Sequence, residues 1–178
     1  MGLILLRHTT PDVSLGTCYG RTDLDVVDSF ADEARKAAEA LPAFDRIVSS
    51  PLTRCRRLAS FVAERAKLDV QVDMRIQEMD FGNWEGFLWS DIPREGLDAW
   101  AADFLHARPH GGESVAELRD RVGAALADWS TPGISTLIVT HSGVIRAALS
   151  TGDGAGDFNV NIDFGGFVTL PPSQGDAP

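Results

Sequence analysis

Two short aliphatic runs that each lead into a histidine place the strongest limits on how this chain can fold. The first, Leu3–Leu6, is followed by Arg7 and His8 and then by two threonines and a proline, which end regular structure. Four consecutive aliphatic residues are too few for a helix, so the run predicts a strand that is buried on both faces. The second run, Leu137–Val139, continues through one threonine to His141 and predicts a strand of the same kind.

The position of both histidines at strand ends indicates a ligand site. In open α/β sheets, ligands bind in the crevice beyond the carboxyl ends of the strands. We therefore expect Arg7, His8 and His141 to meet in such a crevice, where a cation and two imidazoles suit an anionic substrate. A lone histidine is more often a satisfied residue of the core, but two histidines at equivalent strand ends favour function.

The rest of the chain alternates strand and helix patterns, which is typical of an α/β fold. Strands are expected at 46–50 and 70–72, with one or two more at 158–170, and helices at 29–41, 51–67, 114–129 and 142–149, with an irregular helical stretch at 89–105. Ser50 is a good N-cap and Pro51 suits the first helical position, so the second of these helices should begin here. Arg54 then lies in its first turns beside free amide groups, where an anion would bind. Arg56 and Arg57 are expected on a solvated face. Ser114 and Glu117 have the spacing of a capping box, which predicts the start of the helix at 114–129.

Composition and charge narrow the classes of function. A chain of 178 residues fits one domain, which we place at 1–170, followed by a polar tail at 171–178 that is expected to be disordered. The net charge of −10 and the pI of about 4.7 argue against partners such as nucleic acid or an anionic membrane. A few local arginines can still form a positive pocket for a phosphorylated small molecule.

The sequence also bears on location. No apolar run is long enough for a membrane span or a signal peptide. The two cysteines, Cys18 and Cys55, are too few for a disulfide scaffold and suit a reducing compartment. We therefore expect a cytoplasmic protein.

The segment Gln77–Gly86 interleaves acidic residues with aromatics and glycines. Aromatic neighbours lower the local dielectric constant around a carboxyl group, which raises its pKa and makes it a usable general acid. The alternative is an ordinary acidic loop above aromatic residues of the core, and the pattern alone does not decide between them.

No metal site is predicted. His106 and His110 are four residues apart, but no third ligand stands nearby, and Pro109 and Gly111 break the helix that would bring them to one face. We interpret His110 as a loop histidine and expect no metal or other cofactor.

Five motifs occur in a recognisable order. They are Arg7-His8, Ser50–Arg54, Glu78 before Phe81–Gly86, Gly111–Ser114 and Thr140–Gly143. Each is weak alone, but together they resemble the histidine phosphatase superfamily, also called the phosphoglycerate-mutase-like family, and most of all its small α-ribazole phosphatases. The resemblance extends from about residue 3 to about residue 170. It implies a three-layer sandwich with a mostly parallel central sheet flanked by helices.

The resemblance also implies a mechanism. His8 would be the nucleophile and carry the phosphoryl group as a phosphohistidine before it passes to water. Arg7, Arg54 and His141 would hold the phosphate oxygens and stabilise the charge of the transition state. Glu78 would protonate the leaving alkoxide and then act as base toward water. No metal is needed, because these side chains supply the positive charge.

Two residues depart from the family pattern. Thr9 stands where the family usually has glycine, and Ser14 stands where many members carry an asparagine that helps to bind phosphate. Ser14 or Thr10 would partly replace that asparagine. Arg21 and Trp84 are further candidates for the substrate pocket.

The resemblance suggests α-ribazole 5′-phosphate, from cobalamin assembly, as a specific substrate, within the wider class of small phosphate esters. A phosphoglycerate mutase is an alternative, although those enzymes are generally longer. A phosphohistidine-protein phosphatase is another, although those usually lack the Phe-Gly-x-Trp-Glu-Gly segment. A non-catalytic phosphate-binding or regulatory module on the same fold also stays open, because Thr9 departs from the pattern. The sequence leaves the oligomeric state undecided, with a homodimer among the options.

Overall fold

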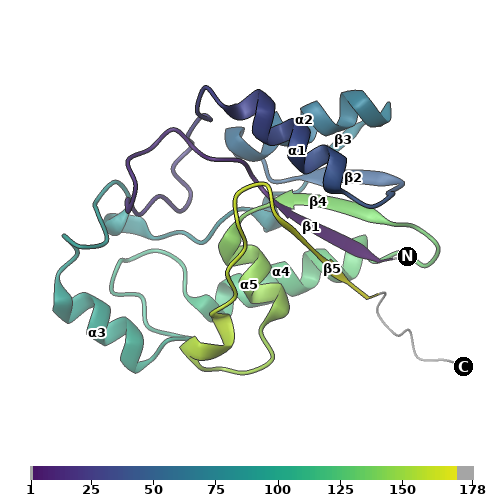
Figure 1. Cartoon of the computed structure of the whole chain (residues 1–178). Coiled ribbons are helices and arrows are strands. Elements are labelled where there is room, and N and C mark those ends of the chain that lie inside the picture. The colour runs from purple at the N-terminus through teal and green to yellow at the C-terminus, as the bar shows by residue number, and fades with distance from the viewer. Residues whose placement is uncertain (1, 172–178) are drawn as a thin grey trace, which may run out of the picture.

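The computed structural model describes residues 2–171, which form an α/β fold around one five-stranded sheet (Figure 1). The strands are β1 (Leu3–Arg7), β2 (Arg46–Ser49), β3 (Val70–Val72), β4 (Thr136–Thr140) and β5 (Phe167–Leu170), in the order β3-β2-β4-β1-β5. The first four of these run parallel to their neighbours, and β5 pairs antiparallel with β1. The expected mostly parallel sheet is therefore confirmed.

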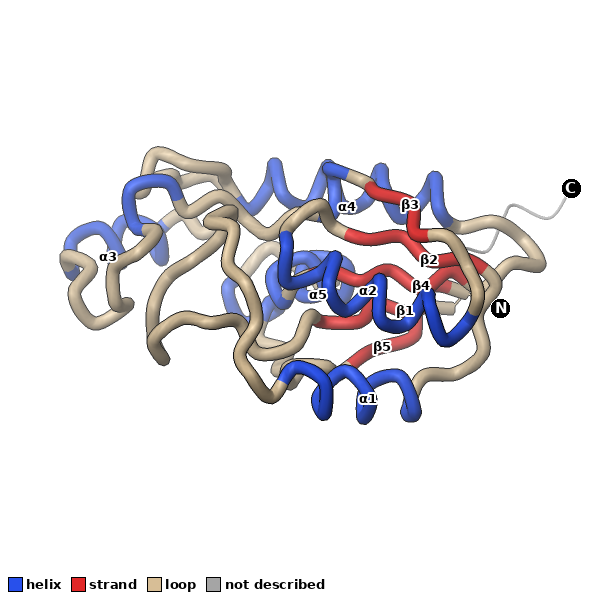
Figure 2. The backbone as a smooth tube through the Cα atoms, turned by 90° about the horizontal axis from the view of Figure 1, so that it is seen from above, coloured by secondary structure: helices blue, strands red, loops and turns tan. Residues whose placement is uncertain are grey.

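Helices cover both faces of the sheet. They are α1 (Phe30–Ala40), α2 (Thr53–Ala66), α3 (Arg94–Ala102), α4 (Val115–Trp129) and α5 (Ser142–Leu149), with short 3-10 turns η1 (Met74–Ile76), η2 (Gly82–Trp84) and η3 (Ala155–Phe158). Figures 1 and 2 show α1 and α2 on one face and α4 and α5 on the other, which confirms the three-layer sandwich. Helix α3 lies apart from the sheet, beyond the ends of the parallel strands.

Strand alternation divides the core into two halves. Ile4 and Leu6 of β1 pack in the cluster formed with α1 and α2, whereas Leu3 and Leu5 pack in the cluster formed with α4 and α5. All four side chains are at most 5% exposed. An uninterrupted aliphatic run suits this position, because successive side chains enter opposite layers and both layers are dry.

The helix expected to begin at Pro51 begins two residues later, at Thr53. The backbone is still extended at Leu52, with φ −67° and ψ 140°, so the prediction of Ser50 as N-cap is wrong. The Ser50 hydroxyl instead bonds to the ring of His141, with 2.8 Å between Oγ and Nε2. Arg54 nevertheless lies in the first turn of α2, as expected.

Other predictions from the sequence can be compared with the structure. The irregular stretch at 89–105 contains one helix, α3, that covers only its middle, and the stretch at 158–170 contains one strand, β5. The capping box before α4 is confirmed, since Ser114 Oγ accepts from the backbone N–H of Glu117 and the Glu117 carboxylate accepts from that of Ser114. The predicted tail lies outside the described residues except for Pro171.

Within residues 2–171, no helix has both the length and the apolar character needed to cross a membrane.

Candidate active site

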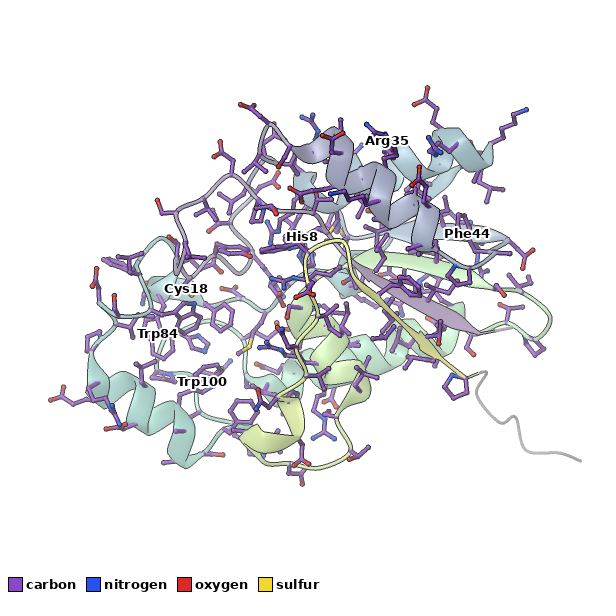
Figure 3. All side chains as sticks on the ribbon, in the orientation of Figure 1. His8, Cys18, Arg35, Phe44, Trp84 and Trp100 are labelled. Carbon is purple, nitrogen blue, oxygen red and sulfur yellow. The ribbon has the colours of Figure 1, made fainter. Side chains whose placement is uncertain are left out.

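Adjacent parallel strands bring the two predicted histidines together. Strand β1 pairs with β4 so that Arg7 lies opposite Thr140, and the next residue on each strand is a histidine. The backbone N–H of His8 donates to the carbonyl of Thr140 over 3.0 Å. The two imidazole rings lie edge to face, with centroids 5.2 Å apart. The expectation that both histidines meet at one edge of the sheet is confirmed, and Figure 3 shows His8 at that edge.

His8 presents one free ring nitrogen. Its Nδ1 lies 2.7 Å from the carbonyl oxygen of Thr9, and a carbonyl can only accept, so Nδ1 carries the hydrogen. Burial lowers the pKa of His8 well below its usual value, and the nearby positive charge of Arg54 lowers it further. The ring is therefore neutral near pH 7, with its lone pair on Nε2, as a nucleophile requires.

His141 is also buried and neutral. Burial is the main cause that lowers its pKa, and the neighbouring His8 and Arg54 add to it. Its Nε2 lies 2.8 Å from Ser50 Oγ and 3.4 Å from Cys55 Sγ. Ser50 therefore orients the ring of His141. The Ser50 hydroxyl makes this bond and does not cap helix α2.

The two predicted arginines are held by backbone carbonyls. Arg54 is fully buried and donates from its two terminal nitrogens to Thr22 and Gly20, each over 2.8 Å. Arg7 donates from Nη1 to the carbonyl of Ile162 over 2.5 Å. These bonds fix both guanidinium groups before any ligand binds.

Three residues near the end of β1 and the start of α2 carry unpartnered polar atoms. The described residues contain five buried side-chain atoms without a hydrogen-bond partner, and three of them are Arg7 Nε, Arg54 Nε and Thr9 Oγ1. An unmade bond of this kind costs about 1–3 kcal/mol. Native proteins satisfy nearly all such groups, so the cluster is suited to a ligand with several acceptor atoms.

Thr9 fits this site without backbone strain. In the described part of the chain, Lys67 is the only residue other than glycine with a positive φ. Thr9 therefore adopts an ordinary conformation although the family usually has glycine there. Its hydroxyl adds a polar group to the cluster.

Glu78 is fixed beside the start of α5. Its two carboxylate oxygens accept from the backbone N–H groups of Met79, over 2.9 Å, and Gly143, over 3.1 Å. A Cβ atom at position 143 would lie 2.2 Å from Glu78 Oε1, so only glycine allows this approach. Glu78 is 9% exposed, and it lines a cavity.

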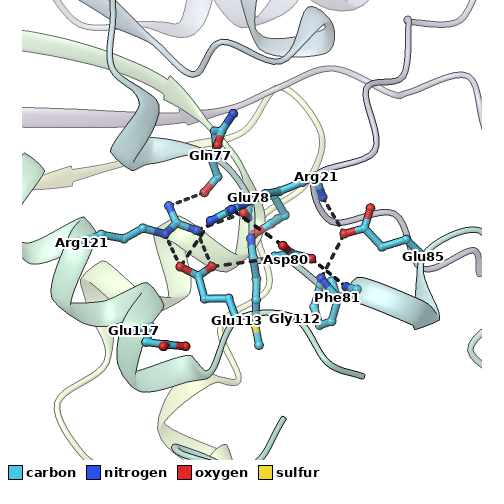
Figure 4. A network of polar contacts seen from close by, with 12 residues as sticks. Arg21, Gln77, Glu78, Asp80, Phe81, Glu85, Gly112, Glu113, Glu117 and Arg121 are labelled. Carbon is cyan, nitrogen blue, oxygen red and sulfur yellow. Dashed lines mark hydrogen bonds and ion pairs between the residues drawn. The ribbon is translucent and has the colours of Figure 1, made fainter. Parts of the chain in front are cut away.

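A partly buried ion pair supports the segment that carries Glu78 (Figure 4). Arg121 of α4 forms two hydrogen bonds with the carboxylate of Glu113. It also donates to the carbonyl oxygens of Arg75, Gln77 and Glu78, over 2.6, 2.8 and 3.0 Å. The glutamate of the Gly-Gly-Glu-Ser motif therefore helps to hold the segment of Glu78 in position.

The cavity next to these groups has a volume of about 760 Å³. Arg7 and Glu78 line it together with Tyr19, Arg146 and several aromatic rings. His8, Arg54 and His141 are each at most 1% exposed and are not among the lining residues. The cavity is large enough for the organic part of a small ester.

The four predicted substrate-binding candidates do not line this cavity. Arg21 pairs with Glu113 and Asp80 at 3.5 and 3.8 Å, and Trp84 is 7% exposed within an aromatic cluster (Figures 3 and 4). Ser14 is exposed on its loop, and the backbone N–H of Thr10 donates to Glu33. Their roles in substrate binding stay predictions.

Two residues at the site were missed by the sequence analysis. Tyr19 lines the cavity, and its ring lies 5.3 Å from the guanidinium carbon of Arg54. Burial raises the pKa of Tyr19, so its hydroxyl stays protonated.

Phe164 stacks on the Arg7 guanidinium at 3.8 Å and lies 5.6 Å from the His8 ring. The Gly165-Gly166 turn pins it there, since both glycines bond to the backbone of β1 or His8.

The described residues contain no group of three or more His, Cys, Asp or Glu side chains that could hold a metal ion. His110 lies in a loop, as expected, and is fully buried beside Trp84.

Comparison with known proteins matches residues 3–158 to the family model of the histidine phosphatase superfamily, branch 1. The glucosyl-3-phosphoglycerate phosphatase of Mycobacterium tuberculosis is 33% identical over 161 residues, which cover 82% of this chain and 72% of that protein. The adenosylcobalamin/α-ribazole phosphatase of Escherichia coli is 29% identical over 158 residues, which cover 84% and 78%. The crystal structure of the α-ribazole phosphatase from Shigella flexneri is similar with a TM-score of 0.83 and 26% identity, over 98% of this chain and 92% of that one.

Replacing the arginine that supports Glu78 should destabilise the protein. In Arg121→Met, Glu113 keeps only Arg21, at 3.5 Å, as a cation partner, and three carbonyls lose their donor, so the free energy of unfolding should fall by about 1.5–3 kcal/mol in urea denaturation. The control is Arg119→Met on the same helix, whose partner Asp153 is exposed; its loss should be about 0–1 kcal/mol. Equal losses in the two variants would contradict this account of the network.

Stability should fall as the pH drops below about 6.5. His8 and His141 are neutral when folded and bind a proton near pH 6.5 when unfolded, so the unfolded state gains protons first. Between pH 6.5 and 5, each should lower the free energy of unfolding by up to about 1.4 kcal/mol per pH unit. Urea denaturation at several pH values should show a smaller slope of the free energy of unfolding against pH in His8→Gln, because one of the two histidines no longer contributes. An unchanged slope in His8→Gln would show that His8 does not titrate as described.

Proposed function

Because this chain belongs to the histidine phosphatase superfamily, we propose that it hydrolyses phosphate monoesters of small metabolites through a phosphoryl group carried on His8. The observation that supports this most strongly is the cluster of unpartnered atoms on Arg7, Thr9 and Arg54 beside the neutral His8 ring. A phosphoryl group has several acceptor oxygens and a negative charge, and this cluster offers donors and positive charge.

The phosphoryl group would be transferred to His8 Nε2 as the ester bond breaks. Arg7 and Arg54 would donate charge-assisted hydrogen bonds of about 1.5–3 kcal/mol each to its oxygens. Because both side chains are already held by backbone carbonyls, little reorganisation is needed as negative charge develops. His141, oriented by Ser50, would complete the phosphate site.

Glu78 would serve as general acid and then as general base. It would protonate the leaving alkoxide and later accept a proton from the water that attacks phosphohistidine. Its position at the cavity wall, held by the N–H groups of Met79 and Gly143, suits both steps. Proton transfer of this kind contributes about 10²–10⁴-fold to the rate.

For the substrate, α-ribazole 5′-phosphate stays the specific candidate. Proteins named for α-ribazole phosphatase activity resemble this chain in sequence and in structure. Glucosyl-3-phosphoglycerate is a second candidate, because it is the named substrate of the relatives from Mycobacterium tuberculosis. We also propose action in the cytoplasm, since Cys18 and Cys55 are buried free thiols that suit a reducing compartment.

Phosphate release with a chelator present tests the proposal. The panel should contain α-ribazole 5′-phosphate, glucosyl-3-phosphoglycerate, 3-phosphoglycerate and a sugar phosphate. His8→Ala should abolish turnover because the nucleophile is lost, and Glu78→Gln should lower kcat by about 10²–10⁴-fold because no proton is supplied. His106→Ala, an exposed loop variant, should match the wild type. Equal turnover in wild type and His8→Ala would contradict the assignment, and absence of turnover on every ester would favour a phosphate-binding module.

A further inference from the structure

Arg54 carries a buried positive charge that forms no direct ion pair. Its side chain is fully buried, and none of the ion pairs among the described residues includes it. Its terminal nitrogens donate instead to the carbonyl oxygens of Gly20 and Thr22, each over 2.8 Å. Burying a charge costs free energy unless other groups compensate it. The groups that hold these two carbonyls therefore decide how well the guanidinium is placed.

The carboxylate of Glu85 binds the same loop from its other side. Its Oε1 accepts from the backbone N–H of Arg21 over 2.9 Å, and its Oε2 accepts from that of Thr22 over 2.7 Å. The hydroxyl of Thr22 donates to Oε2 as well. Residues 20–22 therefore give two N–H groups to Glu85 and two carbonyls to Arg54.

The peptide group between Gly20 and Arg21 connects the two charges most directly. Its carbonyl accepts from Arg54, and its N–H donates to Glu85. The described chain has no cis peptide bond, so the carbonyl and the N–H point in opposite directions and the two charges face each other across one peptide group. Hydrogen bonds in such a chain polarise and strengthen one another. Glu85 thus compensates Arg54 at a distance, while Arg54 Nε stays without a partner and is left for a phosphate oxygen.

The same carboxylate also bonds to the segment that follows Glu78. Glu85 Oε1 accepts from the backbone N–H of Phe81 over 3.0 Å, and Figure 4 shows Glu85 joined to both Arg21 and Phe81. Only glycine at position 20 allows the loop to lie so close, because a Cβ atom there would be 2.5 Å from Glu85 Oε1. The loop that holds Arg54 is therefore built against the segment that carries Glu85.

We propose that Glu85 is a positioning residue for phosphate binding: it fixes the peptide groups of residues 20–22, and through them it orients the Arg54 guanidinium toward the phosphoryl group. The proposal rests on the phosphate site of the proposed function. It adds to that site a residue that does not line the cavity and acts only through Arg54.

Glu85→Gln tests the proposal with little change in shape. Each carboxylate oxygen of Glu85 accepts from two donors, so the amide nitrogen of a glutamine would face two donors and lose both bonds. The two carbonyls then lose their fixed position, and Arg54 loses its orientation. The dissociation constant of inorganic phosphate, measured by NMR titration of the whole chain, should rise by about 10- to 100-fold, which corresponds to one charge-assisted hydrogen bond.

Glu117→Gln is the matched control. The Glu117 carboxylate also accepts from the backbone N–H and the hydroxyl of a single residue, Ser114, over 2.7 and 3.0 Å, and it does not line the cavity. Its variant should bind phosphate as the wild type does. An equal rise of the dissociation constant in both variants would overturn the proposal, as would wild-type affinity in Glu85→Gln.

A double-mutant cycle separates positioning of Arg54 from a general effect on the loop. Arg54→Lys keeps the charge but loses the planar fork that contacts both carbonyls. In that background, Glu85→Gln should weaken phosphate binding by no more than about 2-fold, because its effect passes through the fork. An undiminished effect in the Arg54→Lys background would show that Glu85 acts through other groups, and it would overturn the proposal.

Binding and turnover together distinguish failure of this proposal from failure of the phosphatase function. Phosphate binding is measured without a reaction, and NMR follows the signals of the folded protein alone. If the wild type hydrolysed no ester but Glu85→Gln still weakened phosphate binding through Arg54, the positioning role would stand and the phosphatase function would fail. If the wild type hydrolysed esters and Glu85→Gln bound phosphate as tightly as the wild type, only the positioning role would fail. A wild type that binds no phosphate would overturn the positioning role whatever the turnover.

Discussion

The parallel pairing of β1 with β4 is the constraint on which the site depends. Its register places Arg7 opposite Thr140, so the residue that follows each strand is a histidine at the same edge of the sheet. A shift by one residue would turn the aliphatic side chains of β1 toward the wrong layers and move His8 away from His141. The dry packing on both faces holds this register, and it therefore also fixes the ring centroids of His8 and His141 5.2 Å apart.

Burial of so many polar groups at one place is tolerated because most of them are satisfied or neutral. The two histidines are neutral, and the two arginines give their terminal N–H groups to carbonyls. Among the described residues, only five buried side-chain atoms lack a hydrogen-bond partner, and three of them belong to Arg7, Thr9 and Arg54. A bound phosphoryl group would supply acceptor oxygens to the two arginines.

The sequence predicted those parts of the site that depend on local pattern. Aliphatic runs, their terminal histidines and the capping box at Ser114 are short-range signals, and each was confirmed. Ser50 was misread because a serine before a proline has the local signature of an N-cap, whereas its true partner, His141, lies 91 residues away. Tyr19 and Phe164 could not be placed either, because loop paths are set by distant contacts, such as those that pin Phe164 against β1.

The most direct test of the account is to identify the atom that carries the phosphoryl group. Rapid quenching of the wild type during turnover of a phosphate ester, followed by peptide mass spectrometry under conditions that preserve acid-labile phosphoramidates, would locate it. The account predicts one phosphoryl group, on the peptide that contains His8. A phosphoryl group on another residue, or turnover with no phosphorylated enzyme at any time, would contradict it.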